Sequence, residues 1–155
     1  MPVFSLEMKV RDYECDMQGI VNNAVYQNYL EWARHEFLLS KGLSFAELTA
    51  RGVIIVVIRA ELDYRQSLRG GDTFRVTVVA RKLSRLRMIF EQQIHLQADG
   101  KLMLEAQFTA TAIDQKQRPY FPDELKCLFT DTNSPALKQP LSRMGTKRVK
   151  KLPHG

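Results

Sequence analysis

The sequence is poor in cysteine and has no long hydrophobic run. Only two of its 155 residues are cysteines, and Cys15 and Cys127 form no C-x-x-C pair, which excludes a disulfide scaffold and favours a reducing compartment. The longest aliphatic run, residues 53–58, covers six positions, whereas a helix needs about 20 to span a bilayer. Because the first residues also lack the basic start and apolar core of a secretory signal, we expect a cytoplasmic protein without a membrane partner.

Acidic residues are scarce in one segment only. The net charge is +6, and residues 131–155 contain six basic residues against one acidic residue, whereas residues 1–130 contain 17 and 16. The basic surplus therefore belongs to a C-terminal segment of low apolar content, which we expect to be a disordered tail. Such a tail can bind phosphates by counterion release, but it has no aromatic residue for base stacking. A nucleic-acid partner is therefore not expected.

Residues 1–130 have the composition of one ordinary globular domain. The chain is 45% hydrophobic and 26% charged, which excludes collagen, coiled coil and wholesale disorder. A chain of this length buries about 70% of its unfolded surface. That is enough for one core without disulfides or metals.

Hydropathy periods predict a strand, two helices and four further strands. Residues 4–10 alternate apolar and polar side chains, the period of a half-buried strand. Residues 24–41 have helical spacing between the N-cap candidates Asn22 and Asn23 and the C-terminal Gly42. A Ser-x-x-Glu capping box predicts a short helix next. This short helix is predicted at residues 45–51. Strands are predicted at about 53–66, 72–83, 86–98 and 102–114, and a last element near 125–129.

Short turns such as Asp99-Gly100 separate the four later strands. Strands joined this closely must run antiparallel, because parallel neighbours need a long crossover. An amphipathic helix followed by such a meander predicts an α+β fold, a curved five-stranded antiparallel sheet packed around one long helix. The exposed edges of this sheet favour pairing of two subunits.

The residues that carry chemistry lie between the first strand and the long helix. Asp12, Glu14 and Asp16 share a short loop in which Gly19 permits a tight bend, and the helix begins soon after. The free N–H groups and dipole of a helix N-terminus attract negative charge. A carboxylate beside them is placed to attack a carbonyl, or to activate water, while those N–H groups hold the oxygen as an oxyanion site. The alternative is that the aspartates only form the turn and the asparagines only cap the helix.

A family resemblance strengthens the chemical interpretation. The string D-Y-E-x-D-x-x-G-x-V-N-N-A-V-Y, followed by Y-x-E-x-A-R and later by A-E-L-D-Y-R-Q-S-L-R-G-G-D, resembles the hotdog-fold thioesterases of the 4-hydroxybenzoyl-CoA thioesterase type. The likeness covers about residues 3–125 and is greatest to the plant plastidial acyl-ACP thioesterases of the methylketone-synthase kind and their bacterial relatives. It implies an acyl-CoA or acyl-ACP thioesterase. No cofactor is expected, and the three histidines and two cysteines are too scattered in the sequence for a metal site. It also implies a homodimer with a site shared by two subunits, and pairing of dimers into a tetramer.

The resemblance also assigns roles to residues. It makes Asp16 the catalytic carboxylate, as nucleophile or as general base, and the backbone N–H of Asn23 the donor to the thioester carbonyl. Many bacterial members have histidine where this chain has Asn23. The substrate-binding candidates are Gly19, Val21, Tyr26, Arg85 and Arg87.

Two alternatives stay open at this point. Arg85 and Arg87 belong to a basic run that is either a solvated strand face or a phosphate contact for coenzyme A or acyl carrier protein. The whole scaffold is also compatible with a hydroxyacyl thioester dehydratase or with a non-catalytic acyl-thioester binder. A dehydratase needs a general base, usually histidine, and neither His35 nor His95 lies near the loop in sequence.

Overall fold

The computed structural model of the chain describes residues 3–129, so the tail expected at 131–155 lies outside the described residues. Every predicted helix or strand is present, with boundaries within two residues of those expected; the short turn η1 was not predicted. In chain order the elements are β1 (Phe4–Lys9), the 3₁₀ turn η1 (Asp12–Glu14), α1 (Asn23–Ser40), α2 (Phe45–Ala50), β2 (Ile54–Tyr64), β3 (Thr73–Ser84), β4 (Arg87–Leu96), β5 (Leu102–Ile113) and η2 (Asp123–Phe129).

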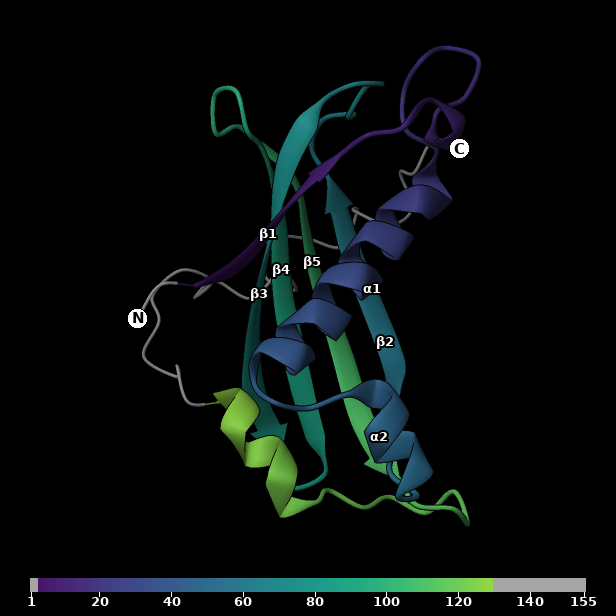
Figure 1. Ribbon diagram of the computed structural model, residues 1–155, viewed down its shortest axis with the longest axis vertical. Coiled ribbons are helices and arrows are strands. Elements are labelled where there is room, and N and C mark those ends of the chain that lie inside the picture. The colour runs from purple at the N-terminus through teal and green to yellow at the C-terminus, as the bar shows by residue number, and fades with distance from the viewer. Residues whose placement is uncertain (1–2, 130–155) are drawn as a thin grey trace.

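The strands form one five-stranded antiparallel sheet in the order β1-β3-β4-β5-β2. It is a curved sheet with α1 lying across one face, as Figure 1 shows. The α+β hotdog architecture expected from the sequence is therefore confirmed. No helix within residues 3–129 is both long enough and apolar enough to cross a membrane.

The expectation of a four-strand meander is wrong for one strand. β2 pairs with β5 at the edge of the sheet and does not neighbour β3. Residues 65–72 instead cross the end of the sheet, where Arg65 bonds to Met103 of β5, Leu68 to Val21 and Gly71 to Val10. A short connection fixes strand direction but not adjacency, and these backbone bonds satisfy the crossing segment.

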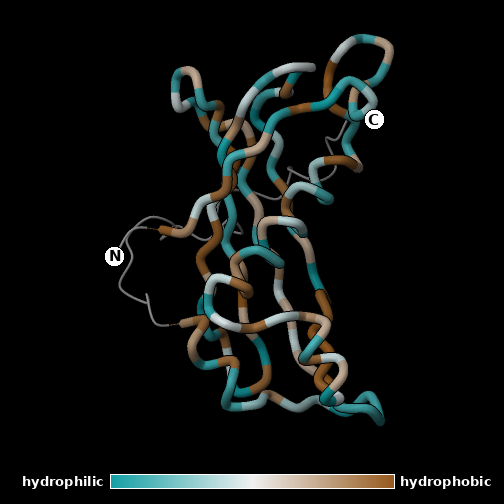
Figure 2. Tube along the Cα trace, in the orientation of Figure 1, coloured by the Kyte–Doolittle hydropathy of each residue, from teal (hydrophilic) through white to brown (hydrophobic). Residues whose placement is uncertain are grey.

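The core lies between α1 and the concave face of the sheet. Brown and teal alternate along the strands in Figure 2, so one face of each strand supplies apolar side chains. The buried face of α1 includes Tyr26, Leu30 and Phe37, and it packs toward Phe74 and Phe90. Each fully buried side chain of this size contributes about 1.5–3 kcal/mol. The helix is thereby held in one position relative to the strands, and its N-terminus with it.

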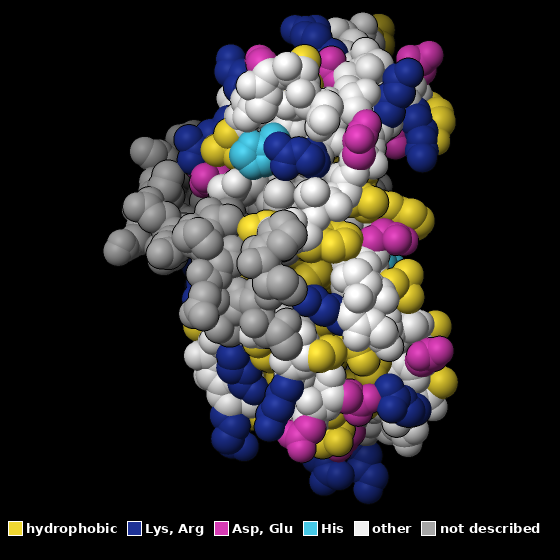
Figure 3. All heavy atoms as spheres, turned by 60° about the vertical axis from the view of Figure 1, so that its left-hand side comes forward, with side chains coloured by type: hydrophobic (Ala, Val, Ile, Leu, Met, Phe, Trp, Pro, Cys, Tyr) yellow, Lys and Arg dark blue, Asp and Glu magenta, His cyan; other side chains and the backbone are white. Residues whose placement is uncertain are grey.

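Charges on the folded part are mixed. Basic and acidic side chains are interspersed over the face in Figure 3, apart from the area that grey atoms cover. Within residues 3–129 both outer strands, β1 and β2, have a strand partner on one side only. On β2 the apolar side chains of Val57 and Ile58 are 44% and 46% exposed, so this edge is both long and apolar.

Candidate active site

The loop that carries Asp16 is a tight turn ordered by its own backbone. The N–H of Asp16 donates to the carbonyl of Ile20 at 2.9 Å, and that of Gly19 to the carbonyl of Asp16 at 3.0 Å. Cys15 and Val21 form the next bridge of this small hairpin. Gly19 has φ +80°, a left-handed conformation that glycine adopts without strain. The loop is therefore a defined structure rather than a variable linker.

The carboxylate of Asp16 uses one oxygen to hold the turn. Its Oδ1 accepts from the N–H of Gln18 at 2.8 Å and from that of Ile20 at 3.3 Å. Within residues 3–129 its Oδ2 has no hydrogen bond or ion pair, and the residue is partly exposed. One oxygen thus fixes the side chain while the other is available to react.

The first turn of α1 leaves one backbone donor open. The side chain of Asn22 caps the N–H of Ala24 at 3.2 Å, and its carbonyl accepts from Val25 at 2.9 Å. The N–H of Asn23 has no acceptor among the described residues. It lies at the positive end of an 18-residue helix. This is the donor that the family resemblance assigns to the thioester oxygen.

Two other predicted substrate-binding residues are buried. Val21 and Tyr26 are 3% and 2% exposed, so both are buried in this chain. The Tyr26 phenol accepts from the N–H of Leu68 at 2.9 Å, and burial raises its pKa. Tyr26 therefore fixes the segment 65–72, which carries the backbone partner of Val21.

Arg85 and Arg87 do not converge with Asp16 within one chain. Both are exposed at the turn between β3 and β4. The other end of β3, at Thr73, pairs with Lys9 next to the loop. At about 3.3 Å per residue a 12-residue strand separates these ends by about 40 Å. A joint role for the arginines and Asp16 needs a second subunit.

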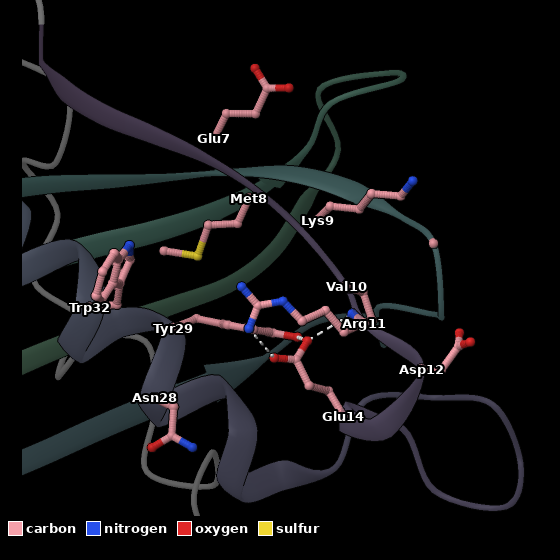
Figure 4. Close-up of a pocket in the computed structure, with 11 residues that line it drawn as sticks. Glu7, Met8, Lys9, Val10, Arg11, Asp12, Glu14, Asn28, Tyr29 and Trp32 are labelled. Carbon is pink, nitrogen blue, oxygen red and sulfur yellow. Dashed lines mark hydrogen bonds and ion pairs between the residues drawn. The ribbon is translucent and has the colours of Figure 1, made fainter.

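An open pocket of about 900 Å³ lies between β1 and α1 beside the loop (Figure 4). In Figure 4 Arg11 and Tyr29 converge on the carboxylate of Glu14, and the Trp32 indole and Met8 form the other end. The lining residues are Glu7, Met8, Lys9, Val10, Arg11, Asp12, Glu14, Asn28, Tyr29, Trp32 and Gly71.

The sequence pattern alone predicts no separate role for Glu14. It places Tyr29 only in the core or a pocket wall. The helical spacing of Tyr29 is visible, but nothing in the sequence pairs it with a carboxylate 15 positions away.

The remaining titratable groups near the loop offer no second chemistry. Burial raises the pKa of the Cys15 thiol, and the carboxylates of Asp12, Asp16 and Glu14 raise it further, so the thiol stays protonated and unreactive. Within residues 3–129, no three His, Cys, Asp or Glu side chains are grouped so as to hold a metal ion. Neither the Cys15 thiol nor a bound metal is therefore expected to supply the chemistry of this loop.

Comparison with known proteins finds thioesterases among the relatives of this chain. The thioesterase-like superfamily matches residues 10–132. The chloroplastic acyl-acyl carrier protein thioesterase ATL2 of Arabidopsis thaliana is 40% identical over 114 residues, 74% of this chain and 61% of that protein. The long-chain acyl-CoA thioesterase FadM of Escherichia coli is 33% identical over 110 residues, 71% of this chain and 83% of FadM.

A solved structure shares the fold. Slr0204, a 1,4-dihydroxy-2-naphthoyl-CoA thioesterase from Synechocystis, superposes with a TM-score of 0.79 at 19% identity, covering 86% of this chain and 100% of that one. At this identity the likeness concerns architecture alone. The chain spans less than two thirds of the plant relative's length.

Proposed function

Since this chain belongs to the thioesterase-like superfamily, we propose that it hydrolyses acyl thioesters to a carboxylic acid and a thiol. The carrier is coenzyme A or acyl carrier protein, the two carriers in the names of the relatives FadM and ATL2. The observation that carries the proposal is that one short loop holds both a carboxylate oxygen of Asp16 and, at its junction with α1, an N–H of Asn23 that have no partner within residues 3–129.

In the proposed reaction Oδ2 of Asp16 attacks the thioester carbon directly or deprotonates a water that attacks it. The carbonyl oxygen, which gains negative charge, accepts from the N–H of Asn23 at the positive end of α1. The C–S bond then breaks and the thiolate leaves. After direct attack the acyl group remains on Asp16 as an anhydride, which water hydrolyses to release the carboxylic acid and restore the carboxylate. A thiol has a pKa near 8.5, so its departure needs little help from an acid, which suits a site with no histidine in the loop.

The experiment is thiol release from a panel of acyl-CoA and acyl-ACP substrates by the Asp16→Asn variant. The amide oxygen of asparagine can still accept from Gln18 and Ile20, so the turn is retained while the acid is lost. We expect turnover to fall about 10²–10⁴-fold. The control is Asp12→Asn, which removes an exposed carboxylate of the same loop and leaves turnover unchanged. Near-normal hydrolysis by Asp16→Asn would remove this residue from the mechanism.

We further propose that the active unit is a homodimer formed through the free edge of β2. The exposed Val57 and Ile58 support this, because natural proteins protect long apolar edges by pairing them. Antiparallel pairing of two β2 strands inverts one subunit relative to the other. The partner's turn with Arg85 and Arg87 then lies at the same end as Asp16, where guanidinium groups suit the phosphates of either carrier. Association of dimers into a tetramer remains a prediction.

The cytoplasm remains the predicted location. The free thiols of Cys15 and Cys127 are consistent with a reducing compartment. The dehydratase alternative gains no support from the site, because His35 packs against Phe45 and His95 bonds to Gln93. Incubation with a 3-hydroxyacyl thioester separates the two reactions, since dehydration yields enoyl absorbance and hydrolysis yields free thiol.

A further inference from the structure

The carboxylate of Glu14 joins the catalytic loop to the body of α1. Its Oε1 accepts from the phenol of Tyr29 at 2.7 Å and from the backbone N–H of Arg11 at 2.8 Å. The carbonyl of the same residue accepts from the N–H of Asn22, the N-cap of α1, at 3.1 Å. Glu14 thus contacts the segment just after β1, the N-cap of α1 and the middle of α1. Its side chain is only 12% exposed although it borders an open pocket.

The contacts of Glu14 fix the position of the loop relative to α1, which the hydrogen bonds of Asp16 do not. Both bonds of the Asp16 carboxylate go to N–H groups of its own turn, so they shape the turn without fixing it relative to the helix. Tyr29 is six residues beyond Asn23 on α1, about 9 Å along the axis at 1.5 Å per residue. Within residues 3–129, the bond between Glu14 and Tyr29 is the side-chain hydrogen bond that ties this loop to the helix body.

The chemistry of the pair favours a persistent bond. Burial raises the pKa of Tyr29, and the hydrogen bond to Glu14 raises it further, so the phenol keeps its proton and donates throughout the neutral range. A hydrogen bond to a charged acceptor is about twice as strong as a neutral one. Arg11 adds a cationic group at 3.7 Å from Oε2. Its side chain is 65% exposed, so its own contribution is small.

We propose that Glu14 and Tyr29 are positioning residues that hold the carboxylate of Asp16 at the N-terminus of α1. This inference rests on the proposed thioester hydrolysis. Reaction geometry is sensitive to such placement, because a shift of about 1 Å can lower a rate about 10²-fold. Neither residue touches the substrate in this proposal, so both act on the reaction step rather than on binding.

The test compares four single variants in the full-length protein. Tyr29→Phe removes only the donor hydroxyl, and Glu14→Ala removes the acceptor. Glu14→Gln keeps an oxygen that can accept from Tyr29 and Arg11. Tyr64→Phe is the matched control, because its half-buried hydroxyl has no hydrogen bond within residues 3–129. We expect Tyr29→Phe and Glu14→Ala to lower kcat about 10- to 100-fold with KM within about threefold. Glu14→Gln and Tyr64→Phe should stay within about threefold of the wild type in both constants.

Amide hydrogen exchange of Gln18, Ile20 and Asn22 supplies a readout that does not depend on activity. If the pair positions the loop, exchange at these N–H groups accelerates in Tyr29→Phe and Glu14→Ala but not in the control. Unchanged kcat in Tyr29→Phe, a loss confined to KM, or unchanged exchange would each overturn the inference. If the wild type hydrolyses none of the thioesters, the proposed function fails instead, and the exchange rates still decide whether the pair orders the loop.

Discussion

The role of Asp16 as a turn former and its proposed role as nucleophile or general base are compatible at the scale of a single residue. Oδ1 holds the N–H groups of Gln18 and Ile20, which is the ordinary role of aspartate in a turn. Oδ2 has no hydrogen-bond partner within residues 3–129. A side chain fixed at one oxygen loses little further freedom when the other oxygen meets a substrate. The turn thereby orders the group proposed to react.

Gly19→Ala tests how far activity depends on the backbone of this turn. Gly19 and Gly42 have nearly equal φ values, +80° and +82°, and a Cβ added at either position has no described atom within 4 Å. An alanine at either position therefore costs only backbone strain, about 1–2 kcal/mol. We expect Gly19→Ala and Gly42→Ala to lower the free energy of unfolding equally, as measured with denaturant. Only Gly19→Ala should lower kcat, and equal effects on kcat would contradict the prediction.

Arg34 carries a different residue-scale prediction, on stability. It is buried, donates to Gln92 at 3.0 Å and lies 4.1 Å from the ring centre of Phe108. Burial lowers its pKa to about 10, so it remains charged at neutral pH. Arg34→Met leaves the amide oxygen of Gln92 without this donor, which costs about 1–3 kcal/mol.

Replacing Gln92 as well removes the unsatisfied oxygen. We expect the double variant Arg34→Met, Gln92→Leu to be more stable than Arg34→Met alone in denaturant unfolding. If the two substitutions lower the free energy of unfolding additively, the hydrogen bond between Arg34 and Gln92 contributes no stability of its own, and the prediction is wrong.

At the scale of secondary-structure elements, α1 has two functions. Its buried face packs on the sheet, and its N-terminus supplies the open N–H of Asn23. The side chain of Asn22 accepts from Ala24 at the second helical position, as N-cap side chains do, while the N–H of Asn23 at the first position keeps no partner within residues 3–129. Helix stability and the availability of the donor are therefore coupled in one cap.

Asn22→Ala tests this coupling. Loss of an N-cap costs about 1 kcal/mol, and the freed N–H of Ala24 makes the start of α1 less well ordered. The matched control is Ser44→Ala, which removes the cap of α2, where the Ser44 hydroxyl accepts from Glu47 at 3.3 Å. Both variants should lose similar unfolding free energy. We expect kcat for thioester hydrolysis to fall only in Asn22→Ala, and an equal fall in Ser44→Ala would attribute the effect to stability alone.

At the scale of the whole molecule, the sheet order decides which strand edges are open to pairing with a second copy of the chain. The strand order leaves β2 at an edge with apolar side chains exposed, whereas β4 and β5 are paired on both sides. It also separates the arginines at the β3–β4 turn from Asp16. A site that uses both requires the proposed dimer.

Ile58→Lys places a charge in the middle of the β2 edge. Since a lysine on an edge strand opposes pairing, we expect a monomer in light scattering coupled to size exclusion, with loss of hydrolysis. Leu83→Lys is the control, because Leu83 is similarly exposed at 50% but lies near the end of β3. A dimer that persists in Ile58→Lys would show that another surface joins the subunits.

The sequence by itself predicted the helices and strands and the acidic loop before α1, and the family resemblance assigned roles to Asp16 and Asn23. Helix and strand periods, the caps at Asn22 and Ser44, and the glycine at position 42 are local signals, because each depends on a few neighbouring residues. They predicted the bounds of the elements to within two residues. The acidic loop before α1 was likewise visible, and with it Asp16 and Asn23.

Only the tertiary structure decided how these parts combine. The position of β2 beside β5, the separation of Arg85 and Arg87 from the loop, and the bond between Glu14 and Tyr29 all depend on packing between distant segments. Hydropathy periods state which face of an element is buried, not which element buries it. The oxygen of Asp16 that remains unbonded is also a result of the folded turn, since both carboxylate oxygens are equivalent in the unfolded chain.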